Sequence, residues 1–380
     1  MPGSRPKTKK AISLKDYAAQ GGRILAALGK PASIDATESR AVAKGRHRPG
    51  KVQGTGLLNA APPAPEVAIW INQNRSSNPV TLILMRTLPI FALLCAVPMV
   101  AQPLADAVRA RIGDFPGAVS LYAKNLDTGA TFGIREAEPV RTASTIKLAI
   151  LCSVFDQVAR SQAKFTDPLT VTDAEQVSGS GIIGTELTPG VRLPLADVAH
   201  LMIVLSDNTA TNMILERFTA DAVNVELDKL GLPKTRSLRK VRGDGNDLKP
   251  PSGWSAAGRL PENQGFGIGV STPREMVTLL EKIDRGDVVS PAAAKEMIEI
   301  LKRQQYRDGI ARHLGEIPVA SKSGALDSLR SDVGIVYSPQ GKIAIAITCD
   351  GIPKIDYNVD NEGVLLISRI SDILVDSLAK

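Results

Sequence analysis

The order in which strand-like and helix-like segments follow one another constrains the fold of this chain more than any single residue. Short runs rich in Val, Ile and Ala, bounded by turn residues, predict strands. They lie at residues 117–123, 130–134, 319–324, 331–337 and 342–348. The sequence between the second and third runs is mostly helical or loop-like. We therefore expect an α+β fold (an α/β sandwich) in which one antiparallel sheet is formed from both chain ends, with an all-helical domain inserted at about residues 165–285.

Local signals mark where several of these elements begin and end. The residues at 125–129, Asn-Leu-Asp-Thr-Gly, join the first two strands and predict a β-hairpin. Thr272 followed by Pro273 predicts a helix N-terminus, because threonine caps free N–H groups and proline fits the first turn. The stretch 232–272 lacks apolar spacing, so we expect a long loop there that is either functional or disordered. Helices are predicted at residues 103–112, 144–160, 195–205, 210–218, 273–285, 291–303 and 362–378.

The positive charge of the chain is confined to its beginning. The whole sequence carries a formal charge of +7. Residues 1–84 contain 13 of the 46 Lys and Arg residues but only 4 of the 39 Asp and Glu residues, so they carry +9 and residues 85–380 carry −2. One interpretation is a basic arm that binds nucleic acid or an anionic membrane. Because the segment has little apolar pattern, we favour a non-native or disordered extension and expect no nucleic-acid partner.

Residues 85–101 have the form of a secretory signal peptide. Met85 and Arg86 precede a short apolar run, and Ala101 ends it as a small residue suited to cleavage. The run is too short to span a bilayer comfortably, so we expect no stable membrane insertion; an internal membrane anchor is the alternative. We therefore expect Met85 to be the true start and the mature catalytic domain to be residues 102–380, in the periplasm or secreted.

The cysteines and histidines argue against a metal centre. Without the signal segment only Cys152 and Cys349 remain, each in an apolar run, and we expect two buried small side chains rather than a disulfide. His47, His200 and His313 are too far apart for a His-based metal site and make a Ser-His-Asp triad unpromising. The sequence also lacks a Gly-rich phosphate loop. We expect no metal, no cofactor and a monomer.

A candidate nucleophile lies where the helix at residues 144–160 begins. Ser144 and Lys147 are three residues apart, which places their side chains on one face of a helix. The apolar run after Lys147 would bury the amine, and burial lowers the pKa of a lysine because it disfavours the charged form. A neutral amine beside a serine can take the hydroxyl proton and activate a weak nucleophile. The same spacing arises by chance at Ser4/Lys7, Ser161/Lys164 and Ser237/Lys240.

Two further motifs distinguish Ser144 from those other serines. They are Ser206-Asp207-Asn208 and Lys322-Ser323-Gly324, and each occurs once in the chain. Together with Ser144-Thr145-Ile146-Lys147 they form the motif set of class A β-lactamases and penicillin-binding proteins. Residues 179–184, Gly-Ser-Gly-Ile-Ile-Gly, are also typical of that group. On these motifs the sequence, over about residues 104–380, resembles the class A serine β-lactamase family within the β-lactamase/penicillin-binding protein superfamily.

The chemistry of these side chains and the resemblance together imply their roles. Ser144 would attack a carbonyl carbon and form an acyl-enzyme, with Lys147 as a candidate base. Ser206 would relay a proton to the leaving nitrogen. Asn208 would hold the substrate amide and the Lys147 amine. Asp207 has no evident chemical task, so we expect it to make a hydrogen bond that fixes its loop.

The third motif would bind the substrate. Lys322 offers a positive charge at a sheet edge to a substrate carboxylate and would raise the acidity of the serine in the second motif. Ser323 offers a hydroxyl to the same carboxylate. The resemblance implies that the N–H groups of Ser144 and of Ala325, which follows Gly324, form the oxyanion hole. Loss of one such donor typically costs roughly 10²–10³ in rate.

The sequence departs from the family in the loop that supplies the deacylating base. Class A β-lactamases carry a glutamate there that activates the water releasing the acyl group, but no matching Glu-x-x-Leu-Asn occurs at residues 237–247. Arg242-x-Asp244 is the closest counterpart, and Asp244 is one methylene shorter and would hold water differently. Glu262 fits less well. Arg330 could add a second cation for a carboxylate, although we favour a solvated surface position for it.

The sequence therefore predicts a serine hydrolase that forms an acyl-enzyme through Ser144. The leading hypothesis is a class A-type β-lactamase, which hydrolyses the cyclic amide of β-lactams. One alternative is a D-Ala-D-Ala peptidase, amidase or esterase of the same superfamily that acts on a cell-wall peptide. Another is a penicillin-binding sensor that acylates without turnover. The hypotheses differ in the fate of the acyl group, so deacylation is the step that separates them.

Overall fold

The computed structural model describes residues 101–379. The predicted N-terminal extension (1–84) and the predicted signal peptide (85–101), apart from Ala101, lie outside the described residues. The described residues all belong to one unit of the chain, Pro89–Lys380. None of the helices between residues 101 and 379 is both long and apolar enough to cross a membrane.

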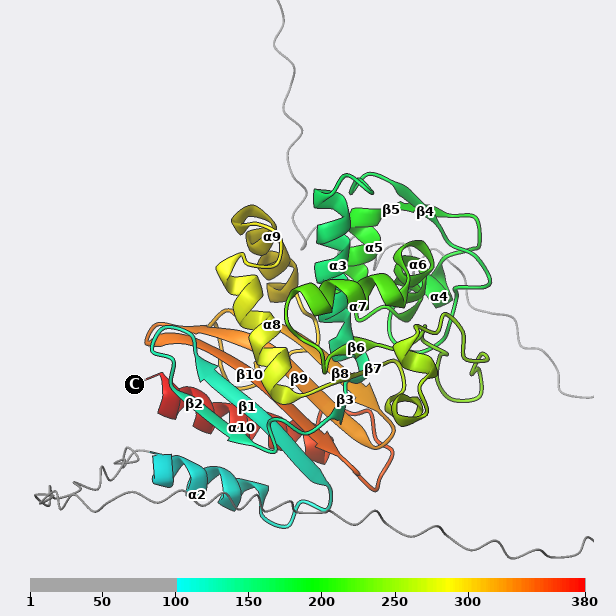
Figure 1. Cartoon of the computed structure of the whole chain (residues 1–380). Helices are drawn as coiled ribbons and strands as arrows, with labels where there is room; N and C mark the ends of the chain where they lie inside the picture. The colour runs from blue at the N-terminus through cyan, green and yellow to red at the C-terminus, as the bar shows by residue number, and fades with distance from the viewer. Residues whose placement is uncertain (1–100, 380) are drawn as a thin grey trace, which may run out of the picture. The chain divides into compact units, whose positions relative to one another are not determined.

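Both ends of the described chain contribute strands to one five-stranded antiparallel sheet, as predicted (Figure 1). The strand order is β2-β1-β10-β9-β8. The N-terminal strand β1 pairs with the C-terminal strand β10 along its whole length, from Ala118 opposite Asp350 to Asn125 opposite Ile343. The strand β8, which carries the third motif, lies at the sheet edge. The bounds are β1 (Ala118–Asn125), β2 (Thr131–Ile134), β8 (Val319–Leu326), β9 (Leu329–Ser338) and β10 (Gly341–Asp350).

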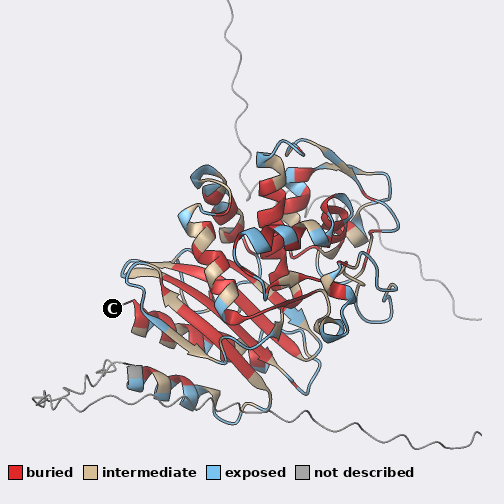
Figure 2. Ribbon diagram, viewed as in Figure 1, coloured by how far each residue is buried: buried red, intermediate tan, exposed pale blue. Residues whose placement is uncertain are grey.

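Helices cover both faces of this sheet (Figure 1). One face is covered by α2 (Ala101–Ile112) and α10 (Glu362–Leu378), and the other by α8 (Pro273–Arg285) and α9 (Pro291–Lys302). Successive strand residues point to opposite faces. On β10, Ile343, Ile345 and Ile347 therefore join the cluster under α10, while Ala344 and Ala346 join the cluster under α8. Because both faces are covered, the central strands are almost wholly buried (Figure 2).

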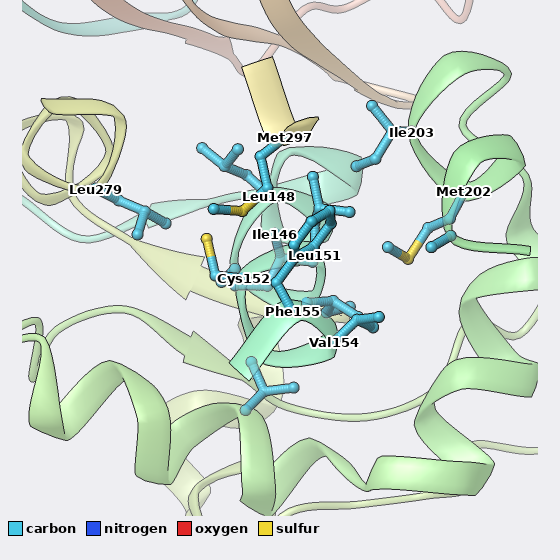
Figure 3. Packing of buried hydrophobic residues seen from close by; sticks show 14 of the residues in the cluster. Ile146, Leu148, Leu151, Cys152, Val154, Phe155, Met202, Ile203, Leu279 and Met297 are labelled. Atoms are coloured by element: carbon cyan, nitrogen blue, oxygen red, sulfur yellow. The ribbon is translucent and has the colours of Figure 1, made fainter. Parts of the chain in front are cut away.

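The helix α3 (Lys147–Ala159) runs through the centre of the remaining helical region. Every residue from Lys147 to Asp156 is buried. Leu148, Leu151 and Phe155 pack in one cluster with side chains from α5 and α9 (Figure 3). This packing holds the first turn of α3, and with it Lys147, in a fixed place. The surrounding helices are α4 (Ile183–Glu186), α5 (Leu195–Val204), α6 (Asn208–Phe218) and α7 (Ala220–Lys229).

The stretch 232–272 is largely irregular, as predicted, but short elements anchor it. Its strand β7 lies between β6 and β3 in a three-stranded sheet. Lys240 is buried in this stretch and forms ion pairs with Glu175 and Glu216. A buried amine needs such partners. The short elements of this stretch are β6 (Arg236–Ser237), η2 (Ala257–Arg259), η3 (Pro261–Phe266) and β7 (Gly269–Ser271). Outside it lie β3 (Val140–Arg141) and a separate two-stranded sheet of β4 (Pro168–Thr170) and β5 (Arg192–Pro194).

The helix signals in the sequence agree closely with the structure. The helix α8 begins at Pro273, and the Glu275 N–H donates to Thr272 Oγ1 at 3.1 Å, so the predicted cap is confirmed. This helix falls within the range predicted for the helical domain, yet it packs on β1 and β10, because its apolar stripe needs an apolar surface to cover. Cys152 and Cys349 are buried, as predicted, and they form no disulfide within the part of the chain that the structure describes.

Candidate active site

Ser144 lies in a sharp turn rather than in the α-helix itself. The turn is the 3₁₀ helix η1 (Ala143–Ile146), which leads directly into α3. Ala143 has a φ of +46°, in the left-handed region that residues with a Cβ rarely adopt. Thr145 and Ile146 are buried, whereas Ser144 is only partly buried. The turn therefore keeps Ser144 at the edge of the core, next to backbone N–H groups that have no partner inside the helix.

Two glycines let neighbouring strands come close to this turn. A Cβ on Gly324 of β8 would lie 2.8 Å from Thr142 O and 3.1 Å from Ser144 N. A Cβ on Gly269 of β7 would lie 2.6 Å from Thr142 Oγ1. The missing side chain at Gly324 thus brings the backbone of β8, including Ala325, beside the Ser144 N–H. An oxyanion hole made of two backbone donors requires such an approach.

The amine of Lys147 is completely buried at the start of α3. Its Nζ donates to Ser206 O at 2.6 Å and to Asn208 Oδ1 at 2.9 Å. Burial lowers the pKa of Lys147 well below its usual range, and the charge of Lys322 lowers it further, while Asp207 acts in the opposite direction. A neutral amine is the form that can accept a proton from a hydroxyl. The environment of Lys147 therefore suits the base predicted for it.

The hydroxyl of Ser206 connects the two buried lysines. Lys322 Nζ donates to Ser206 Oγ at 3.0 Å, and Lys147 Nζ approaches the same oxygen at 3.3 Å. Ser206 has a φ of +54° in the loop between α5 and α6. Strained backbone of this kind persists only where the surroundings hold it in place, and it is often found at functional sites. The position allows Ser206 to pass a proton between Lys147 and a group bound near Lys322, although this relay stays a prediction.

Lys322 is also fully buried, with a second bond from its Nζ to Ser323 O at 2.7 Å. Burial lowers the pKa of Lys322 to about 7, against the opposing charge of Asp332. Asp332 on β9 is itself buried, which raises its pKa to about 7. Its Oδ2 accepts a hydrogen bond from Ile310 N, and its Oδ1 has no partner among the residues described. Asp332 occupies an ordinary strand position in the sequence, and no motif pointed to it.

These pKa shifts predict a bell-shaped pH dependence of kcat/KM for a substrate that carries a carboxylate. Activity should rise with pH as Lys147 loses its proton, because only the neutral amine is a base. It should fall as pH rises through about 7, because Lys322 then loses the charge that binds the carboxylate. Initial rates measured over a wide pH range give both limbs. In Lys322→Arg, which stays charged, the alkaline limb should disappear; an unchanged limb would contradict the assignment.

The other two residues of the second motif have different positions. Asp207 caps α6 and is fully buried, so its predicted loop-fixing role is confirmed. It accepts hydrogen bonds from the backbone N–H groups of Ile182, Ile183 and Ala210. Asn208 turns its Oδ1 to the Lys147 amine and donates from Nδ2 to Ser178 O at 3.1 Å. Asn208 therefore orients Lys147 and is itself oriented by the loop before α4.

Of the two acids considered for deacylation, Asp244 is the one that lies beside the site. A Cβ on Gly179 would lie 2.7 Å from Asn208 Nδ2 and 3.1 Å from Asp244 Oδ2, so both side chains border this glycine. The Asp244 N–H also donates to Ser178 Oγ at 3.0 Å. Asp244 is exposed and open to water. Glu262 is exposed in η3, and within residues 101–379 its carboxylate forms no hydrogen bond or ion pair with a motif residue.

The surface position favoured for Arg330 is wrong. The residue is 4% exposed, its Nη1 donates to Leu329 O at 2.6 Å, and its Nη2 donates to Asp356 O. Its guanidinium stacks 4.6 Å from the centre of the Tyr357 ring. Arg330 therefore ties the loop after β10 to the β8–β9 turn. The sequence could not reveal this, because the burial of Arg330 depends on where the distant loop at 351–360 folds.

Comparison with known proteins agrees with this geometry. Residues 103–378 match the model of the beta-lactamase enzyme family. The beta-lactamase L2 of Stenotrophomonas maltophilia is 26% identical over 279 residues, which are 72% of this chain and 84% of L2. The crystal structure of a beta-lactamase from Sphaerobacter thermophilus superposes with a TM-score of 0.63 at 26% identity, covering 73% of this chain and 97% of that one.

A penicillin-binding protein is about equally similar. A mutant of PBP-A in an acyl-enzyme complex with penicillin G superposes with a TM-score of 0.61 at 26% identity, covering 73% of this chain and 96% of that one. The similarity therefore extends to proteins of both names, while the family match covers nearly all of the described chain. The chain belongs to the class A β-lactamase family, as a distant member and as a serine hydrolase of the β-lactamase/penicillin-binding protein type.

Proposed function

We propose that this protein is a class A-type β-lactamase that opens the β-lactam ring through an ester on Ser144. One observation carries the proposal: Ser206 Oγ lies between the amines of Lys147, at 3.3 Å, and Lys322, at 3.0 Å. This arrangement offers a base near the nucleophile, a hydroxyl on the way to the leaving nitrogen, and a cation for a carboxylate. A β-lactam antibiotic presents the matching groups, a cyclic amide and a carboxylate on the same small molecule.

The reaction follows from these positions. Ser144 Oγ attacks the carbonyl carbon of the lactam while Lys147 takes its proton. The ring C–N bond breaks, and the nitrogen receives a proton through Ser206. The negative charge that develops on the carbonyl oxygen is stabilised by hydrogen bonds from the N–H groups of Ser144 and Ala325. Water then hydrolyses the ester, which releases the ring-opened acid and regenerates the Ser144 hydroxyl.

Relatives support this proposal without deciding it. L2 and the Sphaerobacter thermophilus protein are β-lactamases, and the PBP-A mutant forms an acyl-enzyme with penicillin G. All three are 26% identical to this chain. Both a β-lactamase and a penicillin-binding protein are acylated by a penicillin. Only a β-lactamase hydrolyses the resulting ester rapidly, because hydrolysis requires a group that activates a water molecule for attack on the ester carbonyl.

A second candidate, a penicillin-binding sensor or a D-Ala-D-Ala peptidase, is favoured by the loop at 237–247. The acid there that borders Asn208 is Asp244, which is exposed and one methylene shorter than glutamate. An exposed carboxylate on a short side chain holds an attacking water less firmly than a preorganised one. Slow deacylation of a penicillin would follow, as in a protein whose natural substrate is a cell-wall peptide.

The deciding experiment is intact-mass spectrometry of residues 102–380 after addition of a penicillin, sampled from seconds to hours. For a β-lactamase, we expect an adduct on Ser144 that appears and decays while excess penicillin is hydrolysed. A persistent adduct would favour the sensor or the peptidase, and release of D-alanine from a D-Ala-D-Ala peptide would then separate those two. The absence of any adduct would exclude β-lactams as substrates.

Asp244→Asn is expected to slow deacylation by about 10²-fold or more, the usual contribution of a positioned general base. Acylation should stay within about twofold, because Asp244 makes no hydrogen bond to Lys147 or Ser206 in the described chain. Single-turnover mass spectrometry separates the two steps. Asp247→Asn, which changes an exposed acid of the same loop, is the matched control and should behave as wild type. If both variants deacylate normally, the water is activated by another group.

We also propose that the mature protein is periplasmic or secreted. The support is the signal-like run at residues 85–101, which ends where the described domain begins. N-terminal sequencing of the protein from its native source should start near Gln102. An N-terminus within residues 1–84 would contradict the proposed export. It would also mean that the basic segment is retained in the mature protein.

A further inference from the structure

One arginine ties the segment that leads into Ser144 to two distant parts of the main sheet. Arg141 ends β3 and lies three residues before Ser144. Its Nε donates to Asp350 Oδ2 at 2.9 Å, its Nη2 donates to Ser328 Oγ at 2.9 Å, and Nη2 also bonds Asp350 Oδ1. Asp350 ends β10, and Ser328 lies in the turn between β8 and β9. A single guanidinium therefore joins three segments, two of which border the oxyanion hole expected at Ser144 and Ala325.

The geometry between those two donors depends on these segments. The Ser144 N–H follows Ala143, whose left-handed φ of +46° is strained. The Ala325 N–H follows Gly324, where an added Cβ would lie 3.1 Å from Ser144 N. Donors must stay within roughly 0.5 Å of their productive places to act on a developing charge. A strained turn keeps the Ser144 N–H in its productive position only if contacts fix the turn on both sides.

Different contacts hold the two sides of the turn. Toward β7, the Thr142 N–H donates to Gly269 O at 3.1 Å. Toward β8 and β10, the side-chain link is Arg141. Its pair with Asp350 is bidentate and half-buried, with 29% and 31% of the two side chains exposed. Bidentate arginine–carboxylate pairs fix orientation as well as distance, and partial burial reduces their screening by solvent.

We propose that Arg141 is a positioning residue for the oxyanion hole. Through Asp350 and Ser328 it fixes the distance between the N–H groups of Ser144 and Ala325. The inference rests on the proposed acyl transfer at Ser144 and adds a determinant of the acylation rate, as distinct from substrate affinity. Arg141 and Asp350 are 209 positions apart, and neither belongs to the three motifs.

The test is the rate of acylation of Ser144 in Arg141→Met and in Asp350→Asn. Two probes are used: a penicillin, and a fluorophosphonate, which needs the nucleophile and the oxyanion hole but no β-lactam recognition. We expect acylation to slow by about 10- to 100-fold with both probes, less than complete loss of one donor. The dissociation constant of the initial penicillin complex should stay within about twofold. The double variant should be no slower than the single variants, because both break one unit.

Two further variants separate positioning from general stability. Arg141→Lys keeps the charge but cannot make the bidentate pair, so it should restore only part of the rate. Arg160→Met is the control. Arg160 pairs with Asp156 at 2.8 Å at the far end of α3, so this variant should be acylated at the wild-type rate. If Arg141→Met acylates as fast as Arg160→Met, the proposal is overturned.

Hydrogen exchange at the amides of residues 142–146 tests the same inference without any reaction. We expect these amides to exchange faster in Arg141→Met than in wild type and in Arg160→Met, and equal exchange would overturn the proposal. The test of Arg141 can also be told apart from the test of the proposed β-lactamase activity. If wild type reacts with the fluorophosphonate but with no penicillin, β-lactams are excluded as substrates while the role of Arg141 is still measured.

Discussion

Ser144→Ala is expected to abolish the covalent adduct with penicillin and to lower any turnover by about 10⁶-fold, the scale seen when a serine nucleophile is removed. The physical reason is that Lys147 and Ser206 can only move protons to and from the nucleophilic hydroxyl, and alanine has no hydroxyl to attack the carbonyl. Intact-mass spectrometry should show unmodified protein at all times. The fold should be unchanged, because the side chain is partly exposed and alanine has room in its place.

A matched control tests whether the position of the serine, rather than its spacing from a lysine, carries the activity. Ser161 and Lys164 have the same spacing, yet both are exposed. The Lys164 amine therefore lacks the burial that distinguishes Lys147. Ser161→Ala should therefore form and release the adduct as wild type does. An adduct that survives in Ser144→Ala would place the nucleophile elsewhere in the chain.

Lys147→Met is expected to slow acylation by about 10³-fold, within the range for loss of a general base. It should also stabilise the fold. The folded protein lowers the pKa of Lys147 well below its unfolded value. Below the unfolded pKa, the unfolded chain therefore binds the proton more tightly than the folded chain, which favours unfolding; this cost disappears only as pH rises through the unfolded pKa. Methionine has a similar volume and removes this cost, but it also removes the hydrogen bonds from Lys147 Nζ to Ser206 O, Ser206 Oγ and Asn208 Oδ1.

The stability effect is measured by thermal unfolding at neutral pH, and the catalytic effect by the acylation rate. We expect a melting temperature a few degrees above wild type, since about 1 kcal/mol corresponds to roughly 2–4 °C for a domain of this size. Lys124→Met is the comparison: Lys124 is paired with Glu281 at 2.7 Å, away from Ser144, so its loss should lower stability and leave acylation unchanged. If Lys147→Met unfolds earlier than wild type, its hydrogen bonds outweigh the cost of burying the amine.

Much of the architecture could be predicted because its signals are local. The Asn-Leu-Asp-Thr-Gly turn at 125–129 joins β1 and β2, Thr272 caps α8, and the runs predicted as strands at 331–337 and 342–348 lie in β9 and β10. Each of these depends on residues close in sequence. That strands from both chain ends share one antiparallel sheet followed from the order of elements, whereas the pairing of β1 with β10 was seen only in the structure.

The site was predictable to the extent that it consists of motifs. Ser144 and Lys147 share one helical turn, so their proximity follows from spacing. The meeting of Lys147, Ser206 and Lys322 at one hydroxyl could be expected only from resemblance, since 116 positions separate Ser206 from Lys322. Asp332, Arg141 and the buried state of Arg330 were not predicted. Each depends on a partner brought near by the fold, and none has a pattern of its own in the sequence.

The sequence by itself determined the class of fold and the candidate nucleophile, because periodicity, caps and short motifs are readable over a few residues. Only the tertiary structure decided the charges and distances on which the chemistry depends. Lys147 and Lys322 have lowered pKa values because other elements bury them, and the hydroxyl between them comes from a third element. Asp244 was already the preferred acid in the sequence, and only the fold places its carboxylate against Gly179, which Asn208 also borders. Burial and electrostatic interaction depend on distance in space, and the chain sets those distances only when it is folded.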